Sequence, residues 1–258
     1  MITAASNSRI KRLVQLNQKS KLRRTEDVFL AEGVKIFLEA PREQLQEVYV
    51  SESFLEKCSC REHLEEVGYE VVSDSVFSKI SDTCTPQGVL CVLKQFHYNI
   101  EEMLRDKAPL FLLLENIQDP GNLGTMLRTG EGAGVSGIIM SRDTVDLYNP
   151  KVIRSTMGSI YRVPFYYADD FAAAVHQVQQ AGVSVYAAHL RGKNSYACQD
   201  YTKGTAFLIG NEGNGLREET AELADCYIRI PMEGKVESLN AAVASSILMY
   251  EAHRQRAI

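Results

Sequence analysis

The stretch ENIQDPGNLGTMLRTGEGAG, residues 115–134, begins where a leucine-rich run ends and continues through a Pro/Gly/Asn turn into an amphipathic segment. Two later stretches have the same layout: LIGNEGNGLREE at 208–219 and IPMEGKVESLNAAVASS at 230–246. Each places small polar side chains directly after a predicted strand. In open α/β sheets, ligands bind beyond the carboxyl ends of the strands. The three loops therefore predict an α/β fold with a ligand site at one edge of its sheet.

Residues 109–258 predict the larger of two domains. LFLLLE, residues 110–115, is an apolar run of the kind found in strands that are buried on both faces. The other expected strands are GIIMS (137–141), YRVPF (161–165), VSVYAA (183–188), AFLIG (206–210) and YIRIP (227–231). Helices are expected at 123–133, at 169–181, at 239–256 and from Asn149–Pro150 onward. Six strands separated by helices predict a mostly parallel sheet with helices on both faces.

Residues 1–98 predict a smaller α/β domain with its own sheet. Ser6 or Asn7 can cap a helix that runs to about Asn17, because apolar residues recur there at helical spacing. Strands are then expected at 27–33, 47–51, 69–73 and 87–94, with helices between them that include 34–40 and 74–80. The polar residues 99–108 are expected to link this domain to the larger one.

The composition is that of a soluble protein, with 45% hydrophobic and 24% charged residues in a chain of 258. No apolar run approaches the roughly 18 residues of a membrane span. The start, MITAASNSRIKRL, lacks the apolar core of a secretion signal, so we expect a cytoplasmic protein. The cysteines have no metal-ligand spacing, and we expect reduced thiols and no metal site; they are Cys58, Cys60, Cys84, Cys91, Cys198 and Cys226.

The net charge of −5 conceals a basic N-terminal arm. Seven basic residues and no acidic residue lie between Met1 and Thr25, whereas the rest of the chain is acidic. A basic arm on an acidic body is expected where local contact with phosphate groups matters more than overall attraction. A solvated surface helix would have the same composition, so the arm alone leaves both interpretations open.

Two glycine-rich stretches resemble dinucleotide-binding loops in composition only. The glycines at 130–134 lie at the end of a predicted helix, where a helix C-cap explains them better. The glycines at 210–215 follow a predicted strand, but their spacing departs from G-x-G-x-x-G. The sequence also contains no G-x-x-x-x-G-K-[ST] loop. These patterns predict a ligand but favour neither a nicotinamide dinucleotide nor ATP.

Three motifs together resemble a known family. NIQDPGNLGTMLRTGEGAG (116–134), IGNEGNGL (209–216) and IPMEGKVESLNAAVA (230–244) are similar, in order and spacing, to the signature motifs of the SpoU (TrmH) family of RNA ribose 2′-O-methyltransferases. That family belongs to the SPOUT superfamily of S-adenosylmethionine-dependent enzymes. FLAEGVKIFLEA (29–40) and ISDTCTPQG (80–88) resemble the ribosomal-protein-like substrate-binding domain of many members.

The resemblance implies features that periodicity and composition do not. It implies that the larger domain is a SPOUT-type trefoil knot, whose C-terminal segment threads through a loop and forms the pocket for S-adenosylmethionine. It also implies a homodimer, formed through the catalytic domain, with the active site at or near the subunit interface.

The resemblance also carries site residues over one by one. It implies a catalytic set of Asn122, Arg128, Glu212, Ser238 and Asn240. The donor pocket that it implies comprises Gly210, Ile230, Met232, Leu239, Ala187, Ala188, Asn211 and Gly213. Taken singly, these side chains have ordinary explanations too, since Asn122 suits a turn, and Glu212 and Ser238 suit helix caps. The joint pattern favours the site.

Methyl transfer from a sulfonium donor to a ribose hydroxyl is an in-line displacement in which the hydroxyl is the weak reactant. The hydroxyl becomes nucleophilic only as its proton leaves. In the family, Arg128 is the candidate for activating it, yet a guanidinium ordinarily keeps its proton above about pH 12. We therefore interpret Arg128 as orienting phosphate and hydroxyl, with substrate phosphate or water taking the proton. Asn122, Ser238 and Asn240 would fix the ribose by neutral hydrogen bonds.

The basic arm acquires a function in this context. The residues expected to contact RNA phosphates are Arg9, Lys11, Arg12, Lys21, Arg23 and Arg24. We predict an enzyme that methylates a ribose 2′-hydroxyl of structured RNA, with 23S ribosomal RNA favoured over tRNA because of the extra domain. The alternatives are a tRNA 2′-O-methyltransferase, a non-catalytic ribosome-assembly factor with the same fold, and a nicotinamide-dependent oxidoreductase.

Overall fold

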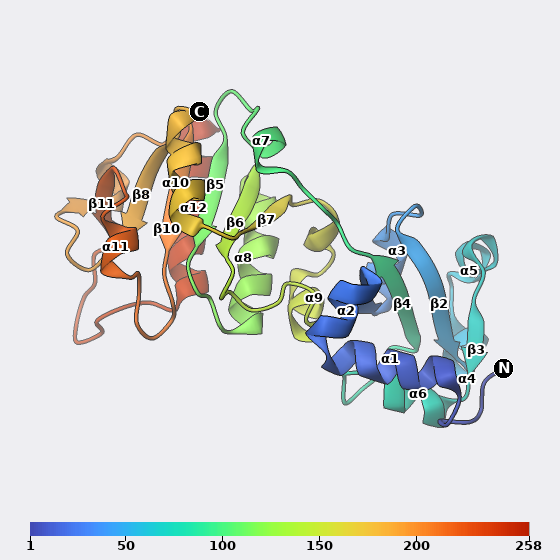
Figure 1. Ribbon diagram of the computed structural model, residues 1–258. Coiled ribbons are helices and arrows are strands. Elements are labelled where there is room, and N and C mark those ends of the chain that lie inside the picture. The colour runs from blue at the N-terminus through green and yellow to red at the C-terminus, as the bar shows by residue number, and fades with distance from the viewer. Residues whose placement is uncertain (258) are drawn as a thin grey trace. The chain divides into compact units, whose positions relative to one another are not determined.

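The computed structural model describes residues 1–257, which divide into two compact units (Figure 1). Unit 1 contains residues 1–96 together with 146–161, and unit 2 contains 97–145 together with the chain from Arg162 onward. No pattern in the sequence indicated that residues 146–161 belong with the N-terminal residues. Because of this insertion, the chain passes from one unit to the other three times.

Unit 1 is built on a four-stranded sheet. Its strands, in spatial order, are β1 (Val28–Glu32), β4 (Val89–Lys94), β2 (Leu45–Ser51) and β3 (Glu70–Val72). Strand β4 runs antiparallel to both β1 and β2, whereas β2 and β3 are parallel. All four strands were predicted from the sequence, and the sheet confirms the small α/β domain.

Helices cover this sheet at positions that the sequence largely predicted. They are α1 (Ser8–Gln18), α2 (Ser20–Glu26), α3 (Val34–Glu39), α4 (Glu52–Lys57), α5 (Arg61–Val67) and α6 (Asp74–Ile80). Of the two predicted caps, Ser6 and Asn7, it is the Asn7 side chain that caps α1, by accepting a hydrogen bond from the Arg9 N–H at 2.9 Å. Helix α1 buries Ile10, Leu13 and Leu16 in the core shared with α6 and the sheet.

The inserted segment 146–161 is held in unit 1 by its tyrosines. It contains α9 (Pro150–Thr156) and the 3₁₀ turn η1 (Ser159–Tyr161). The centroid of the Tyr148 ring lies 4.8 Å from that of Phe29, and the Tyr161 hydroxyl donates to the Ile36 carbonyl at 3.1 Å.

The strand predicted at 161–165 is wrong. A strand begins only after Pro164, which has no N–H to donate to a ladder.

Arg23 attaches the same segment from the basic arm. Its side chain is only 3% exposed, and its Nη2 lies 2.5 Å from Oδ2 of Asp146. Its Nη1 donates to the carbonyls of Leu16 and Asn17. A side chain buried in this way cannot reach an RNA phosphate, so Arg23 leaves the predicted RNA-contacting set.

Two further arginines of the arm are also occupied. Arg12 lies 2.7 Å from carboxylate oxygens of both Glu26 and Glu47, and Arg9 pairs with Glu70 at 2.9 Å. Lys11, Lys21 and Arg24 are exposed and have no ion pair with residues 1–257. The arm thus has fewer unpaired basic side chains than its sequence suggests.

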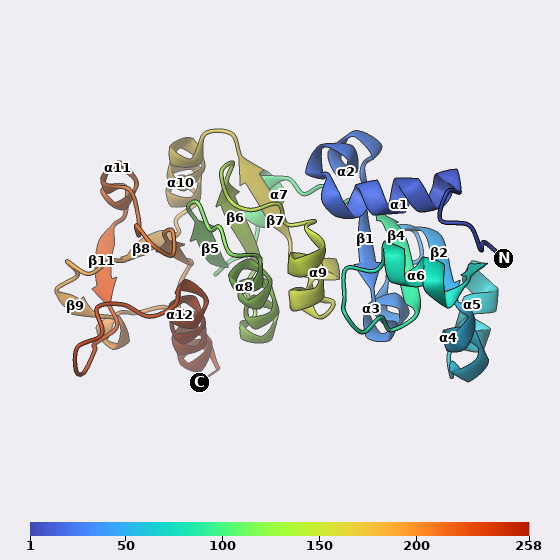
Figure 2. The same cartoon turned by 90° about the horizontal axis from the view of Figure 1, so that it is seen from below.

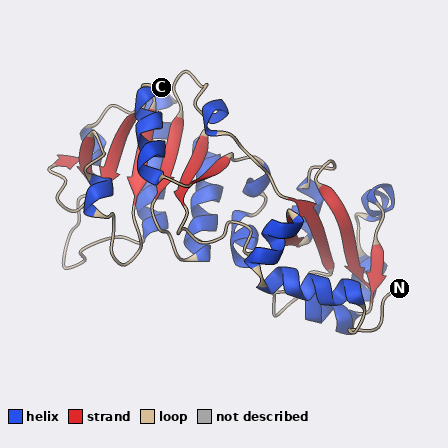
Figure 3. Cartoon of the chain, viewed as in Figure 1, coloured by secondary structure: helices blue, strands red, loops and turns tan. Residues whose placement is uncertain are grey.

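Unit 2 contains a seven-stranded sheet in which every neighbouring pair is parallel (Figure 3). Its strands, in spatial order, are β7 (Phe165–Ala168), β6 (Gly137–Ser141), β5 (Leu110–Leu114), β10 (Thr205–Ile209), β8 (Ser184–Ala188), β11 (Cys226–Arg229) and β9 (Asn194–Ser195). The parallel sheet confirms the prediction. The sequence missed β9, which is too short to show a periodicity.

Helices cover both faces of this sheet, as predicted (Figure 2). Helices α8 (Pro120–Ala133) and α12 (Ala241–Arg256) pack together on one face, and α10 (Phe171–Gln180) and α11 (Glu218–Ala221) lie on the other. The remaining short elements are α7 (Ile100–Met103) and the 3₁₀ turn η2 (Tyr196–Cys198). Within residues 1–257, no helix has both the length and the apolar character that crossing a membrane requires.

The strand order brings the three sequence motifs to one edge. Strands β5 and β10 are neighbours at the centre of the sheet, and β11 lies two places beyond β10. The motif loops follow the carboxyl ends of these strands, and parallel strands end at the same edge. Residues separated by more than 100 positions in the sequence are thereby placed side by side.

Replacing Arg23 tests the role of its buried ion pair. We expect Arg23→Ala to lower the free energy of unfolding by about 3–5 kcal/mol, since Asp146 would be left without its partner. The matched change Arg24→Ala removes an exposed charge and should stay within about 0.5 kcal/mol of the wild type. Urea denaturation of both variants measures the difference, and equal stabilities would refute a structural role for Arg23.

Candidate active site

A chain of hydrogen bonds joins the three motif loops in unit 2. Asn122 Nδ2 donates to Glu212 Oε1 at 3.0 Å, and Asn240 Nδ2 donates to Asn122 Oδ1 at 2.9 Å. Asn240 Oδ1 in turn accepts from the backbone N–H groups of Ala242 and Val243 and so caps α12. One residue from each motif therefore takes part in a single directed network.

Both amides in this network have only one possible orientation. A carboxylate can only accept hydrogen bonds, so Asn122 must turn its amino group toward Glu212. A helix N-terminus can only donate, so Asn240 must turn its carbonyl oxygen toward α12. Each Nδ2 carries two N–H groups and uses one of them within residues 1–257. One N–H of each amide thus remains for a ligand.

Glu212 also binds the backbone of the first motif loop. Its Oε2 accepts from the Gln118 N–H and its Oε1 from the Asp119 N–H, both at 3.0 Å. Partial burial by itself would raise the pKa of Glu212, but the hydrogen bonds from Asn122, Gln118 and Asp119 outweigh it and lower the pKa. The carboxylate is therefore ionised at neutral pH.

Asn211 forms a second connection between the first two motifs. Its Nδ2 donates to the Asn116 carbonyl at 2.8 Å, and its Oδ1 accepts from the N–H groups of Gly213 and Asn214 at 3.0 Å. Asn116 itself has a left-handed backbone, with φ of 54°, which asparagine tolerates better than most residues. The two loops are fixed to one another by these polar contacts.

Gly210 is required by the shape of the second loop. Asn211 and Gly215 form an antiparallel bridge, so the loop folds back onto its own beginning. A Cβ at position 210 would lie only 2.2 Å from backbone atoms of Gly215 and Leu216. No side chain fits there, and the close approach explains the glycine at the end of β10.

Glu115 anchors the far end of this loop, and the sequence motifs did not indicate it. The carboxylate is 2% exposed and accepts from the Arg217 N–H at 2.8 Å and the Thr220 hydroxyl at 2.5 Å. Arg217 Nε also lies 3.0 Å from it. The available signal was an acidic residue directly after the apolar run LFLLL, since a carboxylate at a buried strand end requires partners.

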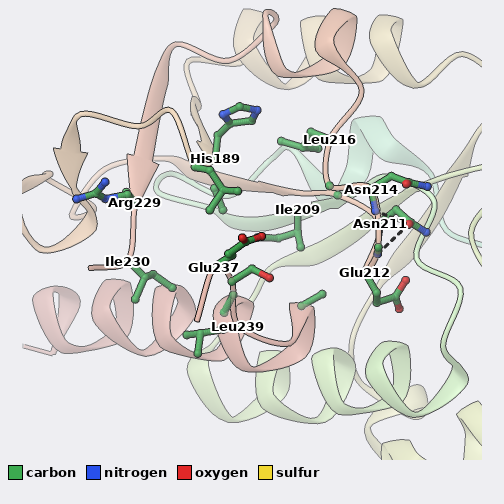
Figure 4. Close-up of a pocket in the computed structure, with 18 of the residues that line it drawn as sticks. His189, Ile209, Asn211, Glu212, Asn214, Leu216, Arg229, Ile230, Glu237 and Leu239 are labelled. Atoms are coloured by element: carbon green, nitrogen blue, oxygen red, sulfur yellow. Dashed lines mark hydrogen bonds between the residues drawn. The ribbon is translucent and has the colours of Figure 1, made fainter. Parts of the chain in front are cut away.

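The loops enclose a cavity of about 490 Å³ (Figure 4). Seven of the eight residues predicted to hold the donor line it: Ala188, Gly210, Asn211, Gly213, Ile230, Met232 and Leu239. Ala187 does not, because its side chain is buried within the sheet. Sequence reasoning missed other lining residues, among them Ile209 and Leu216, which give the cavity apolar walls. Its volume and mostly apolar lining fit a ligand the size of a nucleoside derivative.

A second, more open cavity of about 590 Å³ adjoins the first. Five residues line both: Asn211, Glu212, Gly213, Ser238 and Leu239. Of the predicted catalytic residues, Asn122, Glu212, Ser238 and Asn240 line the second cavity. A ligand in one cavity could therefore meet a ligand in the other at Ser238 and Glu212.

Arg128 is the predicted catalytic residue that the structure does not bring to this group. It is exposed on α8 and lines neither cavity. Gly132, one helical turn further along the same face, lies beside the hydroxyl of Tyr250 on α12. Arg128 thus belongs to an outer surface made by α8 and α12.

The aromatic ring of His189 lines the first cavity. Its ring lies 5.0 Å from that of Tyr227, and its Nδ1 accepts from the Arg191 N–H at 3.1 Å. Burial and the nearby charge of Arg191 lower the pKa of His189, although Glu218 opposes them. The imidazole is therefore neutral at pH 7. Residues 1–257 contain no cluster of three or more side chains suited to hold a metal ion.

Sequence comparisons match both parts of the chain to known families. Residues 109–250 match the model described as the SpoU rRNA Methylase family, and residues 7–91 match the MRM3-like substrate binding domain. The Bacillus subtilis protein named 23S rRNA (guanosine(2553)-2′-O)-methyltransferase RlmP is 32% identical across 96% of this chain and 97% of its own length. The Ralstonia nicotianae protein named 23S rRNA (guanosine-2′-O-)-methyltransferase RlmB is 33% identical across 69% of this chain and 74% of its own length.

Solved structures share the fold along nearly the whole chain. The AdoMet-bound rRNA methyltransferase from Sinorhizobium meliloti has a TM-score of 0.84 at 31% identity and covers 98% of this chain and 97% of that chain. The SpoU methyltransferase AviRb from Streptomyces viridochromogenes, in complex with AdoMet, has a TM-score of 0.87 at 26% identity, with coverage of 97% and 98%.

Replacing Gly210 tests the close approach within the second loop. We expect Gly210→Ala to destabilise unit 2 by about 1–3 kcal/mol, because the methyl group would overlap backbone atoms at 2.2 Å. Gly213→Ala is the matched control, since the nearest neighbour of the added methyl group would be the side-chain oxygen of Asn211 at an ordinary 3.6 Å. Chemical denaturation should separate the two variants. Equal stability would contradict the steric argument.

The lowered pKa of Glu212 predicts how pH affects the network. The pKa in the folded protein lies below its ordinary value of 4.5, so the unfolded chain binds more protons near that pH. The contribution of Glu212 to stability should be complete above about pH 4.5 and be lost as the pH falls through the lower, folded value. The stability difference between wild type and Glu212→Gln, measured from about pH 7 to pH 3, should shrink on acidification. A difference that grows would contradict the sign of the shift.

Proposed function

The chain belongs to the SpoU rRNA methylase family, and from this premise we propose that it methylates a ribose 2′-hydroxyl of 23S ribosomal RNA. The protein is an S-adenosylmethionine-dependent RNA 2′-O-methyltransferase. The observation that carries the proposal is the pair of adjoining cavities, one lined by the donor motif and one by the polar network.

The first cavity would hold the donor and the second the substrate ribose. S-adenosylmethionine supplies an electrophilic methyl group on a sulfonium sulfur. The protein places the acceptor: Asn122 and Asn240 each retain an N–H that can hydrogen-bond a ribose or phosphate oxygen. Ser238 lines both cavities and can orient the reacting hydroxyl. Glu212 holds this arrangement in place by accepting three hydrogen bonds.

We assign the orientation of phosphate and hydroxyl to Arg128, acting from a second copy of the chain. Val243 and Tyr250 are 49% and 50% exposed and lie on one face of α12, seven residues apart. This apolar face adjoins the exposed face of α8 that carries Arg128. A homodimer through α8 and α12 would cover the apolar face and bring Arg128 to the partner's site.

Unit 1 would bind the RNA. Residues 7–91 are similar to a substrate-binding domain, and Lys11, Lys21 and Arg24 remain available for phosphate contacts. Relatives named as 23S rRNA guanosine 2′-O-methyltransferases favour ribosomal RNA over tRNA and, with it, a cytoplasmic site of action. We also propose that the return of the chain from β11 to α12 forms the trefoil knot of the family.

A methylation assay tests the function directly. With labelled S-adenosylmethionine and unmodified 23S ribosomal RNA, we expect incorporation at a single ribose. The change Arg128→Ala should lower the single-turnover rate about 10²- to 10³-fold and leave donor binding intact. Methyl transfer to tRNA alone would change the assigned substrate from 23S ribosomal RNA to tRNA. Binding of RNA without any transfer by the wild type would favour the non-catalytic assembly factor.

Subunit mixing tests whether Arg128 acts across the dimer. Arg128→Ala and Asn122→Ala should each be inactive alone. After exchange of subunits, half of the dimers are mixed, and each mixed dimer has one complete site, so about a quarter of the sites should regain activity. No recovery, with exchange verified by mass, would show that Arg128 serves its own subunit.

A further inference from the structure

The ionisable side chains that line the donor-side cavity differ in whether they are charged and in whether they have a partner. Four ionisable side chains line it: His189, Glu212, Arg229 and Glu237. His189 is neutral at pH 7 because its pKa is lowered, and Glu212 is already engaged by three N–H donors. The free charges of the cavity are therefore those of Arg229 and Glu237.

The two free charges point in different directions. In Figure 4 the Glu237 carboxylate is directed into the cavity, whereas the Arg229 side chain extends away from it. Glu237 has no hydrogen bond or ion pair with any residue that the structure describes. The donor cavity is therefore lined by one unpaired carboxylate, which belongs to the exposed residue Glu237.

The position of Glu237 relates this charge to the chemistry. Its neighbour Ser238 lines both cavities, whereas Glu237 lines only the donor side. A methyl group that passes from donor to ribose must lie where the cavities meet, and the sulfonium sulfur is one bond behind it. Glu237 thus adjoins the point at which the donor carries its positive charge.

We propose that Glu237 recognises the sulfonium charge and so distinguishes S-adenosylmethionine from the demethylated product, S-adenosylhomocysteine. The inference rests on the proposed function of the same site. Donor and product share the adenosine and amino-acid parts and differ in the methyl group and in one unit of charge at sulfur. A carboxylate beside the sulfur attracts the donor and is indifferent to the neutral thioether, so it favours exchange of product for fresh donor.

The expected size of the effect follows from the exposure of the site. Opposite charges about 4 Å apart in water attract enough to change a dissociation constant about fivefold. Leu190 and Val236 also line the cavity and are 63% and 60% exposed. Contact between these apolar side chains and the bound ligand would exclude water and strengthen the attraction beyond the fivefold value.

Calorimetric titration of the full-length protein with each ligand tests the proposal. For Glu237→Gln we expect the dissociation constant of S-adenosylmethionine to rise at least about fivefold and that of S-adenosylhomocysteine to change less than about twofold. Unchanged product binding also shows that the variant is folded. Glu233→Gln is the matched control: it removes the same charge from the same loop, but Glu233 lines neither cavity. This control should bind both ligands as the wild type does.

Three results would overturn the inference. Equal weakening of both ligands by Glu237→Gln would place the carboxylate on a part that donor and product share, such as the ribose of the donor. Unchanged binding of both would remove Glu237 from recognition. The same loss of discrimination in Glu233→Gln would show that the effect comes from the net charge of the protein and not from the position of Glu237. A wild type that binds neither ligand would instead refute the proposed function itself.

Discussion

The hydrogen bond from Asn122 to Glu212 determines the geometry of the whole site. Because a carboxylate only accepts, it sets the orientation of the Asn122 amide, which then sets that of Asn240. Asn240 completes the sequence by capping α12, whose N–H groups only donate. Three segments that are distant in sequence are thereby aligned by one directed set of hydrogen bonds.

The parallel sheet makes such an alignment possible, and it also buries a carboxylate at a strand end that needs hydrogen-bond partners. The ends of β5 and β10 lie side by side, which brings Glu115 and Asn116 next to the loop at 210–217. A buried carboxylate is costly unless its oxygens accept hydrogen bonds. Arg217 and Thr220 supply them, so the burial of Glu115 also fixes the end of the loop at 210–217.

The sequence predicted what local patterns encode and missed what depends on distant partners. Apolar runs located β5, β6 and β10, and Asn7 marked the start of α1. The prediction that Arg23 of the basic arm contacts RNA was wrong, because composition does not reveal that Arg23 pairs with Asp146, a residue 123 positions away. The segment 146–161 looked like part of the larger domain for the same reason. The resemblance to the family implied Asn122 and Asn240 as site residues but did not show that they bond to each other.

The same contacts limit which side chains are available to accept the proton of a ribose hydroxyl. Glu212 is the carboxylate within the network, but its oxygens already accept three N–H groups, and its lowered pKa makes it a weak base. The imidazole of His189 lines only the first cavity, and its Nδ1 already accepts from the N–H of Arg191. A guanidinium group offers hydrogen-bond donors and no acceptor site, so it is unsuited to receive the proton. Asp119 also lines the second cavity, but its Oδ1 already accepts from the N–H of Asn122 at the start of α8. We therefore propose that the side chains around the second cavity position and polarise the hydroxyl, and that a phosphate oxygen of the RNA or water accepts its proton. On this proposal the placement of the RNA is part of the activation.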